Sequence, residues 1–205
     1  MSLSVQKTCV KRLQYSKMVQ QGPLIGTRLD LIPLGKEHEV GLSRAIDLEA
    51  TRYLTEWSAP PDFAKAFQGV LDSGRISYAI VLKGGAAVGS TAFFDVRPDH
   101  RSLEIGHTWI AKEHRASFVN PEMKFLMLRC AFEQLKCVRV QLKTDGRNLR
   151  SQAAMLKLGC TREGLLRQHM IVREGFIRDT AMFSILDAEW PTIKEQLIRR
   201  LGYEP

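Results

Sequence analysis

Apolar and polar side chains alternate most regularly just after the middle of the chain. Val138, Val140 and Leu142 are separated by single charged or amide side chains. A period of two predicts a strand with one face buried and the other face in contact with solvent. We therefore expect a strand over residues 138–144.

A short helix and a hairpin are expected after this strand. Asn148 stands where a helix N-cap belongs, apolar residues recur at helical spacing as far as Leu158, and Gly159 follows at the C′ position. Two further apolar segments predict a two-stranded hairpin. Its second strand opens at Arg178 and Asp179, and we expect an ion pair there to hold the register of the hairpin.

The rest of the chain shows the same two periods, interrupted by proline and glycine. The expected elements are strands over 24–34, 77–82, 86–94 and 103–110, and helices over 36–49, 63–71, 121–135 and 190–201. Asn120 is expected as the N-cap of the third of these helices, with Pro121 as its first residue. Helices interleaved with hairpins predict an α+β protein whose mixed, mostly antiparallel sheet is flanked by helices.

Composition narrows the class of protein. The chain has 205 residues, of which 44% are hydrophobic, which is enough for one sizeable core. We expect a single domain over residues 24–205, preceded by a disordered basic extension over 1–23 that contains four Lys and Arg residues and no acid. Neither a run of about 18 apolar residues nor the apolar core of a secretory signal occurs, so no membrane span is expected.

Charge and cysteine content narrow it further. The net charge is +8, and half of this excess lies in the extension. A modest basic excess suits a small polyanionic ligand. The sequence contains no patch of interleaved aromatic and basic residues, which would have favoured nucleic-acid binding. The four cysteines lack metal-binding spacing, so no metal site is expected. Cys130, Cys137 and Cys160 fall in or next to apolar elements, and we expect them to be buried free thiols in the reducing cytoplasm.

Three motifs resemble the C-terminal half of the GNAT acetyltransferases, a superfamily of acyl-CoA-dependent N-acyltransferases. The motifs are Asn148-x-x-Ser151, Lys157-Leu158-Gly159 and Glu163-Gly164-x-x-Arg167. Within the superfamily the chain is most similar to the RimJ/RimL type, over roughly residues 24–201. The resemblance implies a GNAT-like fold with acetyl-CoA as co-substrate, bound in the wedge between strands 103–110 and 138–144.

The pyrophosphate of acetyl-CoA is expected where strand 103–110 gives way to the next helix, because helix N-terminal amides favour anions. The family pattern there resembles Arg/Gln-x-x-Gly-x-Gly/Ala. Arg115 matches its first position, but Phe118 and Asn120 replace the two later small residues, and Ala116 replaces another frequent glycine. Phe118 would either crowd the cofactor or turn outward and leave the amides free. The alternative is a helix-capping loop with no ligand.

The residues implied to bind the cofactor form two groups. The resemblance implies that the amide of Ile110 polarises the acetyl carbonyl. It also implies that Asn148, whose main role is to cap the helix, contacts pantetheine. The loop contributes Arg115, Ala116, Ser117, Phe118, Val119 and Asn120.

Glu104 matches the position of a general base in several GNAT enzymes, where it would deprotonate the incoming amine. Strict alternation would put Glu104 on one strand face with Gly106, Thr108 and Ile110. On the same ground His107 would lie on the opposite face, as a packed side chain. The alternative for Glu104 is an exposed or ion-paired strand residue.

Two further candidates lie after residue 144. Ser151 matches the family residue that protonates the departing thiolate, and its alternative role is to satisfy amides in the first helical turn. His169 falls in the strand that lines the acceptor cleft of RimJ/RimL-type enzymes, where it would contact the amine or act as an alternative base.

The function implied is acetyl transfer from acetyl-CoA to a primary amine by direct attack in a ternary complex. A GNAT protein that binds acyl-CoA or another ligand without turnover is the first alternative, and a basic nucleic-acid-binding module is the second. The acceptor stays open among a protein N-terminus, an amino acid, a polyamine and an antibiotic. A homodimer is one open oligomeric state.

Overall fold

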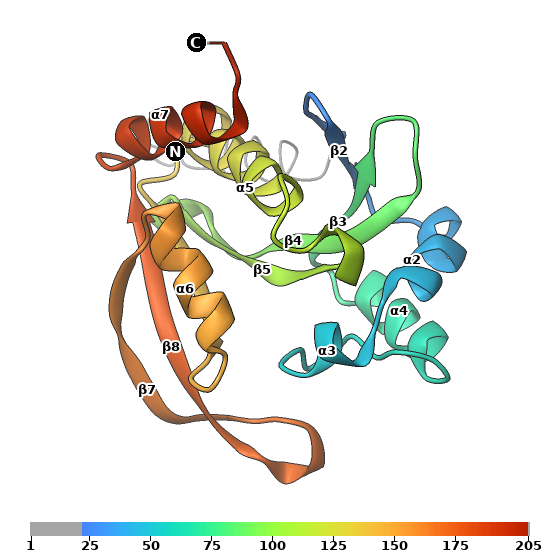
Figure 1. The fold of residues 1–205 in the computed structure, drawn as a ribbon. Coiled ribbons are helices and arrows are strands. Elements are labelled where there is room, and N and C mark those ends of the chain that lie inside the picture. Colours follow the sequence, from blue (N-terminus) through green and yellow to red (C-terminus); the bar gives the residue numbers. More distant parts are fainter. Residues whose placement is uncertain (1–21, 205) are drawn as a thin grey trace, which may run out of the picture.

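The computed structural model describes residues 22–204, so the predicted extension lies outside the described residues except for Gly22 and Pro23. Eight strands form one sheet in the order β1-β2-β3-β4-β5-β6-β8-β7, as Figure 1 shows. Only β5 and β6 are parallel, and every other neighbouring pair is antiparallel. The predicted α+β class with a mixed, mostly antiparallel sheet is confirmed.

The bounds of the elements are as follows. The strands are β1 (Leu24–Ile25), β2 (Leu29–Pro33), β3 (Ile76–Leu82), β4 (Ala87–Arg97), β5 (Ser102–Ile110), β6 (Arg139–Asp145), β7 (Thr161–Ile171) and β8 (Ile177–Leu186). The helices are α2 (Glu39–Ala45), α3 (Leu48–Thr51), α4 (Phe63–Asp72), α5 (Val119–Arg129), α6 (Leu149–Leu158) and α7 (Trp190–Leu201).

Two hydrophobic cores lie on opposite faces of the sheet. The larger core joins the sheet to α5 and α7, which lie together on one side in Figure 1. The smaller core joins the other face to α2 and α4 and centres on Trp57, which contacts the rings of Phe63, Phe67 and Trp109. No described helix is long and apolar enough to cross a membrane.

The first predicted strand is two strands with a tight turn between them. The turn is held from across the fold by Glu122 of α5, which is completely buried. Its Oε1 accepts backbone N–H groups from Thr27 and Arg28 at 2.8 Å and from Leu29 at 3.4 Å, and its Oε2 accepts Arg28 Nε at 3.1 Å. The strand prediction was wrong here because a residue distant in sequence stabilises the turn.

Two helix predictions also need correction. The helix expected over 36–49 breaks after Ala45, and Asp47 caps α3 by accepting the N–H of Ala50 at 2.6 Å. Its apolar face was too narrow to favour a single helix. Helix α5 begins at Val119, so Asn120 lies in the first turn and is not the N-cap. Pro121 is tolerated there because first-turn amides have no helical partner.

A bulge interrupts β5 where alternation had been assumed. In the pairing with β4, Ala92 lies opposite Gly106 and Ser90 opposite Trp109, so β5 has one residue more than β4 between these pairs. His107 adopts a left-handed φ of 51° at this point. An inserted residue of this kind reverses the alternation of faces beyond it.

The two cores show the reversal directly. Leu103 and Ile105, before the bulge, pack in the larger core together with Ile110, which follows it. Trp109 packs in the smaller core on the other face.

The predicted faces of β5 are therefore wrong beyond Gly106. Glu104 and Gly106 share their face with His107, whereas Thr108 and Ile110 face α5. Lys124 Nζ of α5 lies 3.5 Å from Thr108 Oγ1, in agreement with this assignment.

The elements after residue 138 follow the prediction closely. Strand β6 and helix α6 lie within a residue of the expected bounds, and Gly159 ends α6 with a φ of 98°. The β7–β8 hairpin projects from the body of the molecule in Figure 1. Cys130 and Cys160 are buried free thiols as expected, Cys137 is buried as well, and Cys9 lies outside the described residues.

Candidate active site

Strands β5 and β6 separate into a wedge. They pair only at their first positions, the last of which sets Glu104 beside Gln141. Beyond Glu104, β6 stays paired with β8. The edge of β5 that faces β6 pairs with no described strand there, whereas its other edge stays paired with β4. The wedge is the place predicted for acetyl-CoA, and it contains a row of backbone groups with no strand partner.

The backbone of Ile110 faces this open edge. The N–H of Ala111 donates to Val88 O at 2.8 Å. Because alternate residues of an antiparallel ladder bond to the neighbouring strand, the N–H and C=O of Ile110 point away from β4. Its C=O accepts Arg115 Nε at 2.9 Å.

Arg115 is held by two carboxylates at the start of α3. Its Nη2 lies 2.7 Å from Asp47 Oδ1 and its Nη1 lies 3.0 Å from Glu49 Oε2. Burial acts to raise the pKa of Asp47, but the hydrogen bond from Arg115 and the Ala50 amide lower it overall. Glu49 also forms an ion pair with Arg150 of α6. Glu49 thus links the loop after β5 to the start of α6.

The loop before α5 has one strained position and one capping side chain. Ala116 adopts a φ of 58°, a conformation that favours glycine, in agreement with the glycine of the family pattern. The hydroxyl of Ser117 donates to His114 O at 2.6 Å and accepts the N–H of Val119 at 3.2 Å. The ring of Phe118 lies 4.3 Å from the guanidinium carbon of Arg28 and packs against the larger core.

Glu104 lies at the closed end of the wedge and is 1% exposed. Its Oε2 accepts Lys143 Nζ at 2.9 Å and Gln141 Nε2 at 3.0 Å. Its Oε1 is buried and has no hydrogen-bond partner among the described residues. Burial raises the pKa of Glu104, and the charge and hydrogen bond of Lys143 offset part of this rise. A carboxylate with a raised pKa and one unoccupied oxygen is suited to accept a proton.

His107 lies close to Glu104, on the same face. Its ring contacts Phe94 at a centroid distance of 4.9 Å, and its Nδ1 lies 3.6 Å from Glu56 Oε2. Burial lowers the pKa of His107 to about 4, with further lowering by Arg75 and Lys143, so the ring is neutral at pH 7. Alternation had placed this residue away from the site, and no local signal revealed the bulge.

The candidates after β6 differ in their surroundings. Asn148 caps α6 by accepting the N–H of Ser151 at 3.1 Å, as expected. The hydroxyl of Ser151 makes no hydrogen bond within residues 22–204, and the residue is half-buried. His169 is exposed on β7, and burial together with the charges of Lys143 and Arg178 lowers its pKa.

The expected ion pair at the start of β8 is absent from the described residues. Asp179 Oδ1 accepts the N–H of Gln168 at 2.7 Å, and Arg178 Nε donates to Thr180 Oγ1 at 3.1 Å. The prediction was wrong because adjacent residues of a strand point to opposite faces. Lys143 and Gln141 were missed as partners of Glu104, although their alternation had placed both on one face of β6.

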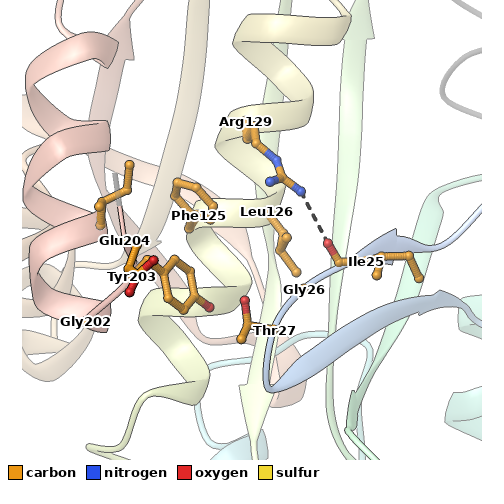
Figure 2. Close-up of a pocket in the computed structure, with 10 residues that line it drawn as sticks. Ile25, Gly26, Thr27, Phe125, Leu126, Arg129, Gly202, Tyr203 and Glu204 are labelled. Carbon is orange, nitrogen blue, oxygen red and sulfur yellow. Dashed lines mark hydrogen bonds between the residues drawn. The ribbon is translucent and has the colours of Figure 1, made fainter.

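A separate cavity of about 530 Å³ lies between the β1–β2 turn, α5 and the end of α7, as Figure 2 shows. Its lining includes Phe125, Arg129 and Tyr203, and Arg129 Nη2 donates to Ile25 O at 3.3 Å. None of the predicted site residues lines it. Within the described part of the chain, no group of three or more His, Cys, Asp or Glu side chains could hold a metal ion.

This fold and site define the class of protein: an α+β protein whose parallel strand pair opens beside a helix N-terminus. Residues 28–161 match the family model described as "Acetyltransferase (GNAT) domain". The match covers more than half of the chain, so the chain belongs to the GNAT acetyltransferase family, as the motifs predicted.

Individual relatives agree with this assignment. The chain is 29% identical over 110 residues to "Putative ribosomal N-acetyltransferase YdaF" of Bacillus subtilis (strain 168), which covers 54% of this chain and 59% of that protein. The chain thus matches less than two thirds of that relative's length.

Solved structures share the fold. A "putative acetyltransferase" from T. thermophilus is 37% identical, with a TM-score of 0.80 over 88% of this chain and 97% of that chain. Mycobacterium smegmatis RimJ in complex with CoA-disulfide is 20% identical, with a TM-score of 0.68 over 89% of this chain and 98% of that chain.

Proposed function

We propose that the protein transfers an acetyl group from acetyl-CoA to a primary amine by direct attack in a ternary complex. The observation that carries this proposal is the position of Glu104, a buried carboxylate with one unoccupied oxygen at the closed end of the β5–β6 wedge. A reaction in the cytoplasm, with a protein N-terminus among the candidate acceptors, agrees with the name of the Bacillus subtilis relative.

The proposed cofactor site follows the open edge of β5 and the N-terminus of α5. The amide of Ile110 would donate to the acetyl carbonyl oxygen, and the loop over 115–120 would receive the pyrophosphate on backbone N–H groups. The contact of Phe118 with Arg28 supports a role for this ring in shaping the loop, not in crowding the cofactor. Asn148 would contact pantetheine from the start of α6.

The proposed chemistry assigns a proton transfer to each of two residues. The amine nitrogen bonds to the carbonyl carbon as the bond from that carbon to sulfur breaks. Glu104, directly or through water, takes the proton released by the amine, and Ser151 gives a proton to the leaving thiolate. His169 is the alternative base.

An acetylation assay across a panel of amines tests the proposal. Purified protein is mixed with acetyl-CoA and each amine in turn, and free thiol release is followed together with the mass of the product. We expect release that depends on the amine. Binding of acetyl-CoA without release would favour the non-catalytic alternative.

Ser151→Ala is expected to lower turnover by roughly 10²- to 10⁴-fold while acetyl-CoA affinity changes little, because a proton donor acts mainly in the transition state. The measurement is kcat together with the dissociation constant of acetyl-CoA. A loss below about threefold would leave Ser151 with a role only in the first turn of α6.

Glu49→Gln is expected to tighten acetyl-CoA binding by about twofold to fivefold, because exposed ion pairs contribute up to roughly 1 kcal/mol. The change releases Arg115 and Arg150 from a carboxylate with which phosphate groups would compete. Calorimetry at low salt measures it. Glu113→Gln is the matched control, since Glu113 is exposed and has no ion pair among the described residues. Equal tightening in both variants would reduce the effect to net charge.

A further inference from the structure

Arg178 is a buried arginine without a carboxylate partner. It is 6% exposed, and its Nε donates to Thr180 Oγ1 at 3.1 Å. No hydrogen bond or ion pair within residues 22–204 reaches its two terminal nitrogens. The guanidinium stays charged at all ordinary pH values, and its two terminal nitrogens reach solvent although the residue is largely buried. They are therefore open to an anion that the described residues do not supply.

The position of Arg178 connects it to Glu104. In the β6–β8 ladder Asp145 lies opposite Thr180 and Lys143 opposite Met182. Side chains two residues apart on a strand share a face, so Arg178 lies on the face that carries Lys143 and its partner Glu104. Burial lowers the pKa of Arg178, while the negative charges of Asp145 and Glu104 act in the opposite direction.

Both of these carboxylates are already bound to other groups. Glu104 accepts Lys143 Nζ at 2.9 Å. Asp145 Oδ2 accepts Arg147 Nη2 at 2.7 Å, and its Oδ1 accepts the backbone N–H of Arg147 at 2.9 Å. Within the described part of the chain, Arg178 therefore shares a face with two carboxylates but has no acceptor for its own terminal N–H groups.

We propose that the acceptor carries a carboxylate as well as its amine, and that Arg178 binds this carboxylate while the amine faces Glu104. The inference rests on the proposed transfer to a primary amine. The planar guanidinium matches a carboxylate through two parallel hydrogen bonds. A polyamine, by contrast, would bring further positive charge to Arg178 and Lys143. The carboxylate belongs either to a free amino acid or to an acidic side chain next to a peptide N-terminus.

The test compares matched acceptors in the thiol-release assay. Alanine against alaninamide tests the free amino acid, and alanyl-glutamate amide against alanyl-glutamine amide tests the peptide. In the wild-type protein we expect kcat/KM for the carboxylate member of one pair to exceed that of its amide by about tenfold to a hundredfold. The pair that shows the preference identifies the source of the carboxylate.

Arg178→Gln should reduce this preference to within about twofold, and Arg178→Lys should keep part of it. The matched control is Arg167→Gln on β7, which removes the same charge from an exposed arginine without a partner among the described residues and should keep the full preference. If Arg178→Gln fails to fold, the proposal is still tested by the ratio of kcat/KM within each acceptor pair, measured in the wild-type protein and in Arg178→Lys.

Equal rates within both pairs in the wild-type protein, or a preference unchanged in Arg178→Gln, would overturn the role of Arg178 and leave acetyl transfer standing. Thiol release from no amine at all would instead overturn the proposed function and this inference with it.

Discussion

Glu104→Gln is expected to lower turnover by about 10²- to 10⁴-fold and to leave the fold intact. The amide keeps the size of the carboxylate and its hydrogen-bonding reach toward Gln141 and Lys143, but it cannot accept a proton at neutral pH. The measurement is kcat with acetyl-CoA and any amine that the panel identifies. The folded state is checked by circular dichroism.

The pH dependence of this variant separates loss of a base from loss of structure. Because burial raises the pKa of Glu104, the wild-type rate should rise with pH as the carboxylate loses its proton, and then level off. In Glu104→Gln the rate should be partly recovered at high pH, where more of the amine is already neutral. A uniform loss at every pH would indicate a structural role in place of a base.

His169→Gln is the matched control for the base. This histidine is exposed and makes no contact with Glu104 among the described interactions. We expect its turnover to stay within a few-fold of the wild-type value. If His169→Gln shows the larger loss and the recovery at high pH while Glu104→Gln is unaffected, His169 is the base.

Glu122→Ala is expected to destabilise the protein by roughly 3–5 kcal/mol, because it leaves Arg28 without its carboxylate and removes the acceptor of three backbone N–H groups in the β1–β2 turn, of which that of Leu29 is buried. Urea unfolding measures the free energy, and the melting temperature should fall by on the order of 10 °C.

Glu133→Ala is the control for this loss. Glu133 also pairs with a cation, Lys194 at 2.7 Å, and accepts Trp190 Nε1 at 3.0 Å, but its side chain is 36% exposed. Its removal should cost about 1 kcal/mol or less. Similar losses in the two variants would show that the backbone amides of the turn contribute little.

The sequence predicted the elements whose signal is local. The alternation over 138–144 and the capping pair Asn148 and Gly159 correspond to β6 and α6 almost residue for residue. The β1–β2 turn has no such signal, because Glu122 stabilises it from α5. Gly26 is the local trace of that contact, since a Cβ there would lie 2.8 Å from Glu122 Oε1 and 2.4 Å from Leu29 O.

The candidate site was predictable to a similar extent. The positions of Glu104 and Ile110 in the wedge were predictable, because both residues lie in a single strand that the sequence pattern predicts. The bulge at His107 has no sequence signature, so the face of this histidine was missed. The partners of Arg115 were also missed, because Asp47 and Glu49 lie in a helix far away in the chain.

The binding of acetyl-CoA is the most direct test of the central claim, that the β5–β6 wedge holds the acetyl donor. A thermal melt of the purified protein with and without acetyl-CoA measures it. At a hundredfold excess over its dissociation constant, a ligand specific for the folded state stabilises it by about 2.7 kcal/mol, which corresponds to a rise of roughly 5–10 °C for a chain of this size. No shift at millimolar acetyl-CoA, with no heat in a calorimetric titration, would contradict the account.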